Sequence, residues 1–137
     1  MAQELVPVTL GLARCLADSG DWAGAERALA DALAAGAATS HPYQVLATFA
    51  GFEAARGRGF RAYRLAGAAA QQRELQPDTD LALQQWLSNR LLQAGQHMSD
   101  DSSSTEWLWG NRLSFAAALT YAVNGVAQNL PTTNVTE

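Results

Sequence analysis

Two glycines, Gly20 and Gly57, each follow a stretch whose apolar residues recur every three or four positions. That recurrence is the spacing of one face of an α-helix. A glycine directly after such a stretch is a typical helix stop, because glycine enters the left-handed conformation without strain. Helix-start signals stand nearby, since Asp21 is a good N-cap and Pro42 suits a first helical turn. The first half of the chain is therefore predicted to form short helices joined in pairs by tight turns.

The apolar residues of the chain are mostly helix formers. The 137 residues include 28 Ala and 18 Leu but only six Val and no Ile, so the β-branched residues that favour strands are scarce. So much alanine also lets helices approach each other closely, as they do in stacked helical hairpins, although a GC-rich genome would give the same bias. We expect one all-α domain over residues 1–127.

A long amphipathic helix is the clearest element of the second half of the chain. It begins after a predicted stop and cap at Pro77-Asp78, carries apolar residues from Leu81 to Leu92 and ends near Gly95. Residues 97–105 are polar and rich in Ser, which predicts a mobile loop.

Two shorter helices are predicted after this loop. The capping box Ser103-x-x-Glu106 starts the first, and Ser114 caps the second, which runs to about Ala127. Residues 128–137 are rich in Asn and Thr and are predicted to be disordered. The expected total is about seven helices.

One stretch, residues 12–32, has the small and large positions of a tetratricopeptide unit. Its small residues would let the two helices touch, while its large residues would fill the space around them. The small ones are Ala13, Ala25 and Ala32, and the large ones are Leu16, Trp22 and Leu29. A looser copy follows, whose turn glycine stands 37 positions after Gly20, against roughly 34 in an ideal repeat. The expected fold is a short right-handed solenoid of stacked antiparallel helical hairpins.

Two further stretches resemble the C-terminal tetratricopeptide-like region of bacterial regulators of the LuxR type, AfsR-like proteins included, and of related STAND signal-transduction ATPases. The first runs from Ala54 to Glu74 and looks like that family's helix pair before its longer helix. The second runs from Trp107 to Val123 and is similar to the family's closing short helix, turn and terminal helix. The resemblance implies a helical-repeat module in bacterial signalling or transcription regulation.

The chain departs from that family in two ways. The family usually has acidic residues at the start of its closing helix, where they complement the helix dipole, and this chain has Ala116 and Ala117. The regulators also carry an ATPase domain, but the chain has no Gly-x-x-x-x-Gly-Lys-Ser/Thr loop and no Lys at all. Hydrolysis of ATP by that mechanism is therefore not expected. The chain is interpreted as an excised domain, a truncated relative or a stand-alone module.

Net charge and cysteine content limit the kinds of partner and the cellular location that we expect. A net charge of −4 and a pI near 5.0 offer no general attraction for nucleic acid or for anionic membranes. A single cysteine, Cys15, suits a reducing cytoplasm, and its helical, apolar setting predicts packing in the core. We find no export signal or membrane-spanning stretch in the sequence, so a cytoplasmic location is expected.

The residue patterns do not predict an enzyme, a cofactor or a metal site. His41 and His97 are isolated from other metal ligands. The carboxylate pairs, at 78 and 80 and at 100 and 101, precede predicted helices, where acidic residues satisfy free amides. No pattern supplies a general base to Cys15 or to the serines at 102–104.

One basic patch, residues 56–64, carries four arginines with aromatic residues between them. Solvated arginines on a helix turn are the favoured interpretation, and contact with an anion or with nucleic acid is the alternative. Trp107 and Trp109 stand two positions apart, so they cannot share a helix face. One is expected in the core, and Trp109 is the candidate to face a partner.

The leading hypothesis is a non-catalytic module whose concave groove binds a peptide, a protein or a second copy of itself. The alternative is a small-molecule sensor, with aromatic walls and an arginine for an anionic group. The candidate groove residues are Tyr43, Phe49, Phe52, Arg56, Phe60, Arg61, Tyr63 and Trp109. For the aromatic ones, ordinary core packing is the preferred interpretation. A short array should also leave apolar edges at its ends, which predicts self-association.

Overall fold

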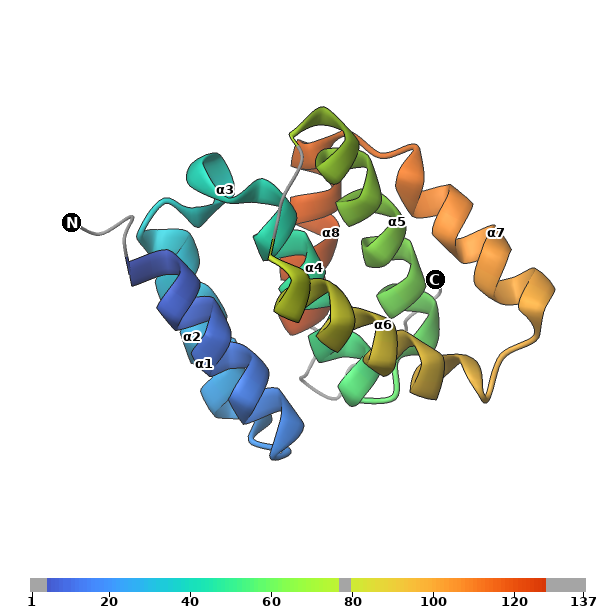
Figure 1. The fold of residues 1–137 in the computed structure, drawn as a ribbon, viewed down its shortest axis with the longest axis horizontal. Helices are drawn as coiled ribbons and strands as arrows, with labels where there is room; N and C mark the ends of the chain where they lie inside the picture. The colour runs from blue at the N-terminus through green and yellow to red at the C-terminus, as the bar shows by residue number, and fades with distance from the viewer. Residues whose placement is uncertain (1–4, 77–79, 128–137) are drawn as a thin grey trace.

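The computed structural model describes residues 5–76 and 80–127, which form helices and no strand (Figure 1). The helices are α1 (Val6–Asp18), α2 (Trp22–Ala34), α3 (Ala37–Ser40), α4 (Pro42–Ala55), α5 (Gly59–Leu75), α6 (Leu81–Gly95), α7 (Asp100–Asn111) and α8 (Phe115–Ala127). The all-α prediction is confirmed for these residues. The predicted stop and cap at Pro77-Asp78 and the predicted disordered tail at 128–137 lie outside them.

Glycines end three of the helical segments, and two of them, Gly20 and Gly57, are the stops that the sequence predicts. Gly20, Gly36 and Gly57 have φ angles of 82°, 91° and 83°, in the left-handed region that other residues enter only with strain. Side chains cap several of the helix starts. Asp21 and Ser114 each accept a hydrogen bond from the backbone N–H three residues later, at 2.9 and 3.1 Å. Asp80 caps α6 in the same way, at 3.0 Å.

The first two helices pack against each other through small residues. Ala13, Ala25 and Ala32 are buried where α1 and α2 meet. Trp22 at the start of α2 lies edge-on to Phe52 of α4, with ring centroids 6.1 Å apart. The small residues therefore allow the helices to approach closely, and the large ones join the pair to the next helix.

Helix α4 lies at the centre of the fold and packs against α1, α5, α6 and α8 (Figure 1). Every residue from Val45 to Ala54 is buried, so this stretch has no side that faces solvent. A helix that is apolar all round belongs in a core. In an open stack of hairpins, an inner helix keeps one face free for a partner. Here α8 folds back onto α4 and α5, so the chain itself covers that side of the hairpin.

The third pair of helices does not form a closed hairpin. Helix α6 packs on α4 and α7 packs on α5, while α6 and α7 make hardly any contact with each other. Helix α7 approaches α5 through two glycines. A Cβ added at Gly110 would lie 1.7 Å from the carbonyl oxygen of Arg64, and one added at Gly67 would lie 2.0 Å from that of Trp107. Only glycine fits at these two points of contact.

The prediction of a mobile loop at residues 97–105 is wrong. Helix α7 begins at Asp100, and the Ser99 hydroxyl caps it by accepting a hydrogen bond from the Ser102 N–H at 3.0 Å. Asp100 and Asp101 lie in the first turn, where their charges complement the helix dipole. Packing on α5 offsets the low helix propensity of the serines. The predicted capping box Ser103-x-x-Glu106 is also wrong, because both residues lie inside α7. The short α3 was also missed, and it brings the helices of the described residues to eight.

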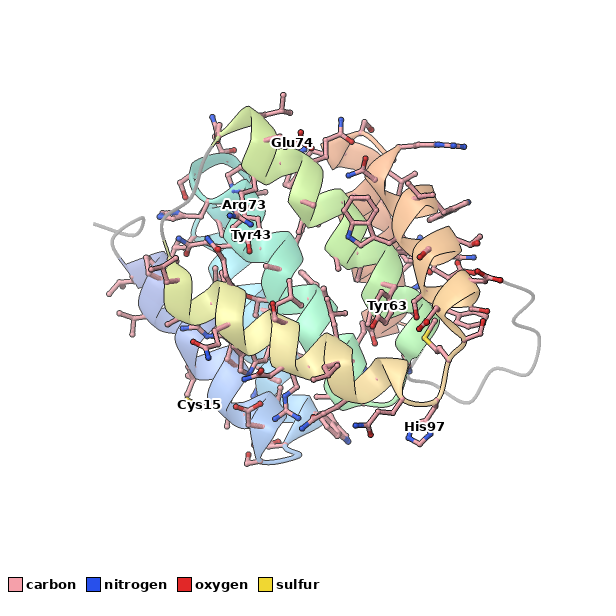
Figure 2. The ribbon with its side chains drawn as sticks, turned by 45° about the vertical axis from the view of Figure 1, so that its right-hand side comes forward. Cys15, Tyr43, Tyr63, Arg73, Glu74 and His97 are labelled. Carbon is pink, nitrogen blue, oxygen red and sulfur yellow. The ribbon has the colours of Figure 1, made fainter. Side chains whose placement is uncertain are left out.

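The prediction that Cys15 packs in the core is also wrong. Cys15 is exposed on α1 (Figure 2), and so is Leu12. The buried face of α1 instead carries Val6, Leu10 and Ala13. Cys15 is nine residues after Val6, which is half a helical turn out of phase, so it points the opposite way.

Candidate functional site

The arginines of residues 56–64 pair with carboxylates, so the expected patch of solvated arginines is not formed. Arg56 lies 3.3 Å from Glu26 of α2, and Arg64 lies 2.5 Å from Glu106 of α7. Arg58 and Arg61 both pair with Glu53 of α4, at 3.5 and 3.0 Å. These ion pairs neutralise the arginine charges within the fold, so the arginines are less available to bind phosphates.

Glu53 is the centre of a buried polar cluster that joins α4, α5 and α8. Its side chain is fully buried, and both of its oxygens face arginines. The two arginines reach on to α8: Arg61 donates to the carbonyl of Tyr121 at 2.6 Å, and Arg58 donates to that of Gly125 at 2.9 Å. A buried carboxylate is costly unless it is paired and hydrogen-bonded, and this one is both. The cluster therefore holds α8 against the α4/α5 hairpin.

A second cluster stacks arginines and aromatic rings where α5, α7 and α8 meet. The guanidinium carbon of Arg61 lies 4.0 Å from the ring centroid of Tyr121, and that of Arg64 lies 4.2 Å from the centroid of Trp109. Burial alone would lower the pKa of Arg64, but its hydrogen bonds with Tyr121 and Glu106 outweigh burial and raise that pKa above its ordinary value. Arg64 is therefore a fixed cation that structures this junction.

The candidate groove residues do not share one surface. Tyr43, Phe49 and Phe52 are buried in the core, which is the packing role preferred from the sequence, and Arg61 is buried in the Glu53 cluster. Burial and the nearby charge of Arg58 lower the pKa of Arg56, whose guanidinium also lies 5.0 Å from the Phe52 ring centroid.

The remaining candidates lie apart. Phe60 is exposed at the start of α5, and Tyr63 is half-buried in the middle of that helix. Trp107 packs against the core while Trp109 is 42% exposed, a split that follows from their spacing. The structure thus separates these residues into core, ion-pair and surface positions.

The largest exposed apolar side chains of α1 lie on one face. Leu5, Val8 and Leu12 are 60%, 69% and 52% exposed, and Cys15 continues their line. Pro7 is exposed beside them, and the charged residue next to this face is Arg14, whose guanidinium lies 3.5 Å from where a Cβ at Gly11 would stand. We call Leu5, Val8, Leu12 and Cys15 the α1 outer face. An uncharged face of this kind is typical of a surface that another molecule covers.

A cavity of about 340 Å³ opens between α6 and α7, over Tyr63 of α5. Figure 2 shows Tyr63 on α5 between these two helices. We call this space the α6–α7 cavity; its lining residues are Tyr63, Leu92, Gly95, Gln96, Asp100, Ser103 and Ser104. It exists because α6 and α7 rest on different helices and diverge from their shared turn.

Most of these features, the Glu53 cluster, the α1 outer face and the α6–α7 cavity, were not predicted from the sequence. Glu53 had a readable signal, because a single carboxylate in an otherwise apolar helix needs a buried cation nearby. Leu5 and Val8 could have been found from the helical phase of α1, which separates them from Leu10. The cavity had no sequence signal apart from Tyr63, since it arises from how two helices are placed.

Comparison with protein-family models, with curated proteins and with solved structures gives no match for this chain. In the described ranges, 5–76 and 80–127, no helix has the length and apolar character needed to cross a membrane. The same ranges hold no group of three or more His, Cys, Asp or Glu residues that could bind a metal ion. The resemblance to LuxR-type regulators stays a prediction drawn from the residues.

Proposed function

We propose that this chain is a non-catalytic, tetratricopeptide-like binding module that associates with a protein partner through the α1 outer face. The observation that carries the proposal is the uncharged, exposed line of Leu5, Val8, Leu12 and Cys15. Each such aliphatic side chain is worth about 1.5–3 kcal/mol when a partner buries it fully. The context we propose, bacterial signalling or transcription regulation, rests on the residue resemblance.

The partner we propose is a second copy of the chain. Large Val8 and Leu12 alternate on α1 with small Gly11 and Cys15. Two such helices paired antiparallel can set the large residues of each against the small ones of the other. Each copy carries a net charge of −4, and Leu5, Val8, Leu12 and Cys15 bring no carboxylate into the interface.

Replacing Leu12 with Glu should weaken self-association at least about tenfold, because it removes one buried side chain and adds a charge that must lose its water. Sedimentation velocity over a range of protein concentrations measures this. The control is Leu81→Glu, which places the same charge on a more exposed leucine at the start of α6, outside the α1 outer face. A wild-type protein that stays monomeric at the highest concentration would contradict self-association.

The reactivity of Cys15 distinguishes the two kinds of partner. If a second copy covers the α1 outer face, the rate at which a thiol reagent modifies Cys15 should fall as protein concentration rises. A rate that is fast and independent of concentration would mean that the face is open in the isolated protein. The proposal would then need a different protein as the partner, and self-association would be wrong.

A second candidate function is small-molecule sensing, favoured by the α6–α7 cavity. Its volume of about 340 Å³ falls at the lower end of the range typical of ligand pockets. Tyr63 is the one candidate from the sequence that lines it. A ligand there would contact both α6 and α7, which hardly contact each other, so binding would fix the position of one helix relative to the other.

A further inference from the structure

The α6–α7 cavity has a lining chemistry that selects a class of ligand. The Tyr63 hydroxyl donates a hydrogen bond to the carbonyl of Leu91 at 2.8 Å, which leaves its ring as the surface that can contact a ligand. Gly95 keeps the wall clear beside that hydroxyl, because a Cβ there would lie 2.6 Å from the Tyr63 oxygen. One wall of the cavity is therefore an aromatic ring in a fixed position.

The opposite wall is the first turn of α7. Asp100, Ser103 and Ser104 of α7 line the cavity, and their side chains end in a carboxylate and two hydroxyls. Within the described part of the chain, these three side chains make no hydrogen bond or ion pair, so they can accept hydrogen bonds from a ligand. The lining contains no arginine, lysine or histidine.

Charge decides between an anionic and a cationic ligand. The N-terminus of a helix carries about half a positive charge, which by itself favours an anion. Asp100 and Asp101 bring two full negative charges to the same turn of α7. The balance at this wall is negative, and the chain as a whole has a net charge of −4. An anion is disfavoured, and a cation is attracted both to Asp100 and to the face of the Tyr63 ring.

We propose that the α6–α7 cavity binds a small primary amine that also carries hydroxyl groups. Its ammonium group pairs with Asp100 next to the Tyr63 ring, and its hydroxyls meet Ser103, Ser104 and the Gln96 amide. The ligand bridges the ends of α6 and α7. This inference rests on the second candidate function, small-molecule sensing, and names its ligand class.

The test is a titration of the isotope-labelled protein, followed by two-dimensional amide NMR. The probes are glucosamine and ethanolamine, matched with their neutral counterparts, glucose and ethylene glycol. We expect both amines to shift the amide signals of Tyr63, Gly95 and Ser103 at lower concentrations than the neutral probes. The Asp100→Asn variant should bind the amines roughly two- to fivefold more weakly, as expected for one partly exposed ion pair.

The control variant is Asp101→Asn, which removes the same charge from the neighbouring, exposed position outside the cavity lining. If Asp101→Asn weakens amine binding as much as Asp100→Asn, the attraction is general and the proposed site is wrong. Neutral probes that bind as well as the amines would overturn the ligand class but leave a sensing site in place. If no probe shifts the cavity signals, both the ligand class and the sensing function fall.

Discussion

Replacing Glu53 with Gln should lower the free energy of unfolding by about 3 kcal/mol. This is the largest effect we expect from any substitution that preserves the size of the side chain. The substitution leaves Arg61 buried without its full counter-charge and turns an amide N–H₂ group toward a guanidinium. The loss is large against the roughly 5–15 kcal/mol that stabilises a typical domain. Urea unfolding followed by circular dichroism measures it.

Asp18→Asn is the matched control for Glu53→Gln. Asp18 pairs with Arg90, but this pair is open to water, with side-chain exposures of 41% and 23%. Asparagine can still accept the hydrogen bond that Trp86 donates to Asp18 at 2.9 Å. We therefore expect a loss below about 1 kcal/mol. Equal losses in the two variants would contradict the view that the Glu53 cluster is a buried, structural ion network.

Replacing Gly110 with Ala should destabilise the protein by about 1–3 kcal/mol, as overpacking does in well-packed interiors. The added Cβ would lie 1.7 Å from the Arg64 carbonyl oxygen, which is backbone and cannot rotate away. Helix α7 must move off α5, so the Arg64 contacts with Trp109 and Glu106 should loosen as well. Thermal unfolding measures the stability, and tryptophan fluorescence reports on the environment of Trp109.

The control is another glycine-to-alanine substitution, Gly11→Ala, whose expected effect on stability has the opposite sign. Gly11 lies in the middle of α1, where an added Cβ would come no closer than 3.5 Å to the end of the Arg14 side chain. Gly11→Ala should therefore stabilise the protein by up to about 1 kcal/mol, because alanine loses less backbone freedom on folding. If Gly110→Ala were also neutral or stabilising, the tight contact between α5 and α7 would be wrong.

Local signals predicted the helix ends well. Gly20 and Gly57 act through their own backbone, and Asp21 acts on an amide three residues away, so neighbouring residues suffice to predict them. The Ser-rich stretch failed for the opposite reason. Its serines are poor helix formers, and the packing of α7 on α5 that overrides this preference involves residues about forty positions away, such as the Arg64 to Glu106 pair at a separation of 42.

The candidate site was harder to predict because it depends on long-range pairing. Arg56 meets Glu26 across 30 positions, so the sequence presented a basic patch where the fold has ion pairs. The aromatic residues were ambiguous for a similar reason. Phe49 and Phe52 suit a groove or a core equally well by type, and only the packing of other helices around α4, such as Trp22 of α2 against Phe52, makes them core.

The return of α8 has a consequence for when the protein can fold. Repeat proteins gain stability step by step, because each repeat contacts only its neighbours. In this chain, Arg61 of α5 binds the Tyr121 carbonyl of α8 across 60 positions, and Trp86 of α6 binds Asp18 of α1 across 68. While the chain leaves the ribosome, the Glu53 cluster stays open to water until α8 has emerged. Folding of residues 5–127 should therefore be completed as one cooperative event only after α8 has emerged, and the most protected amides of α4 should exchange only by global unfolding.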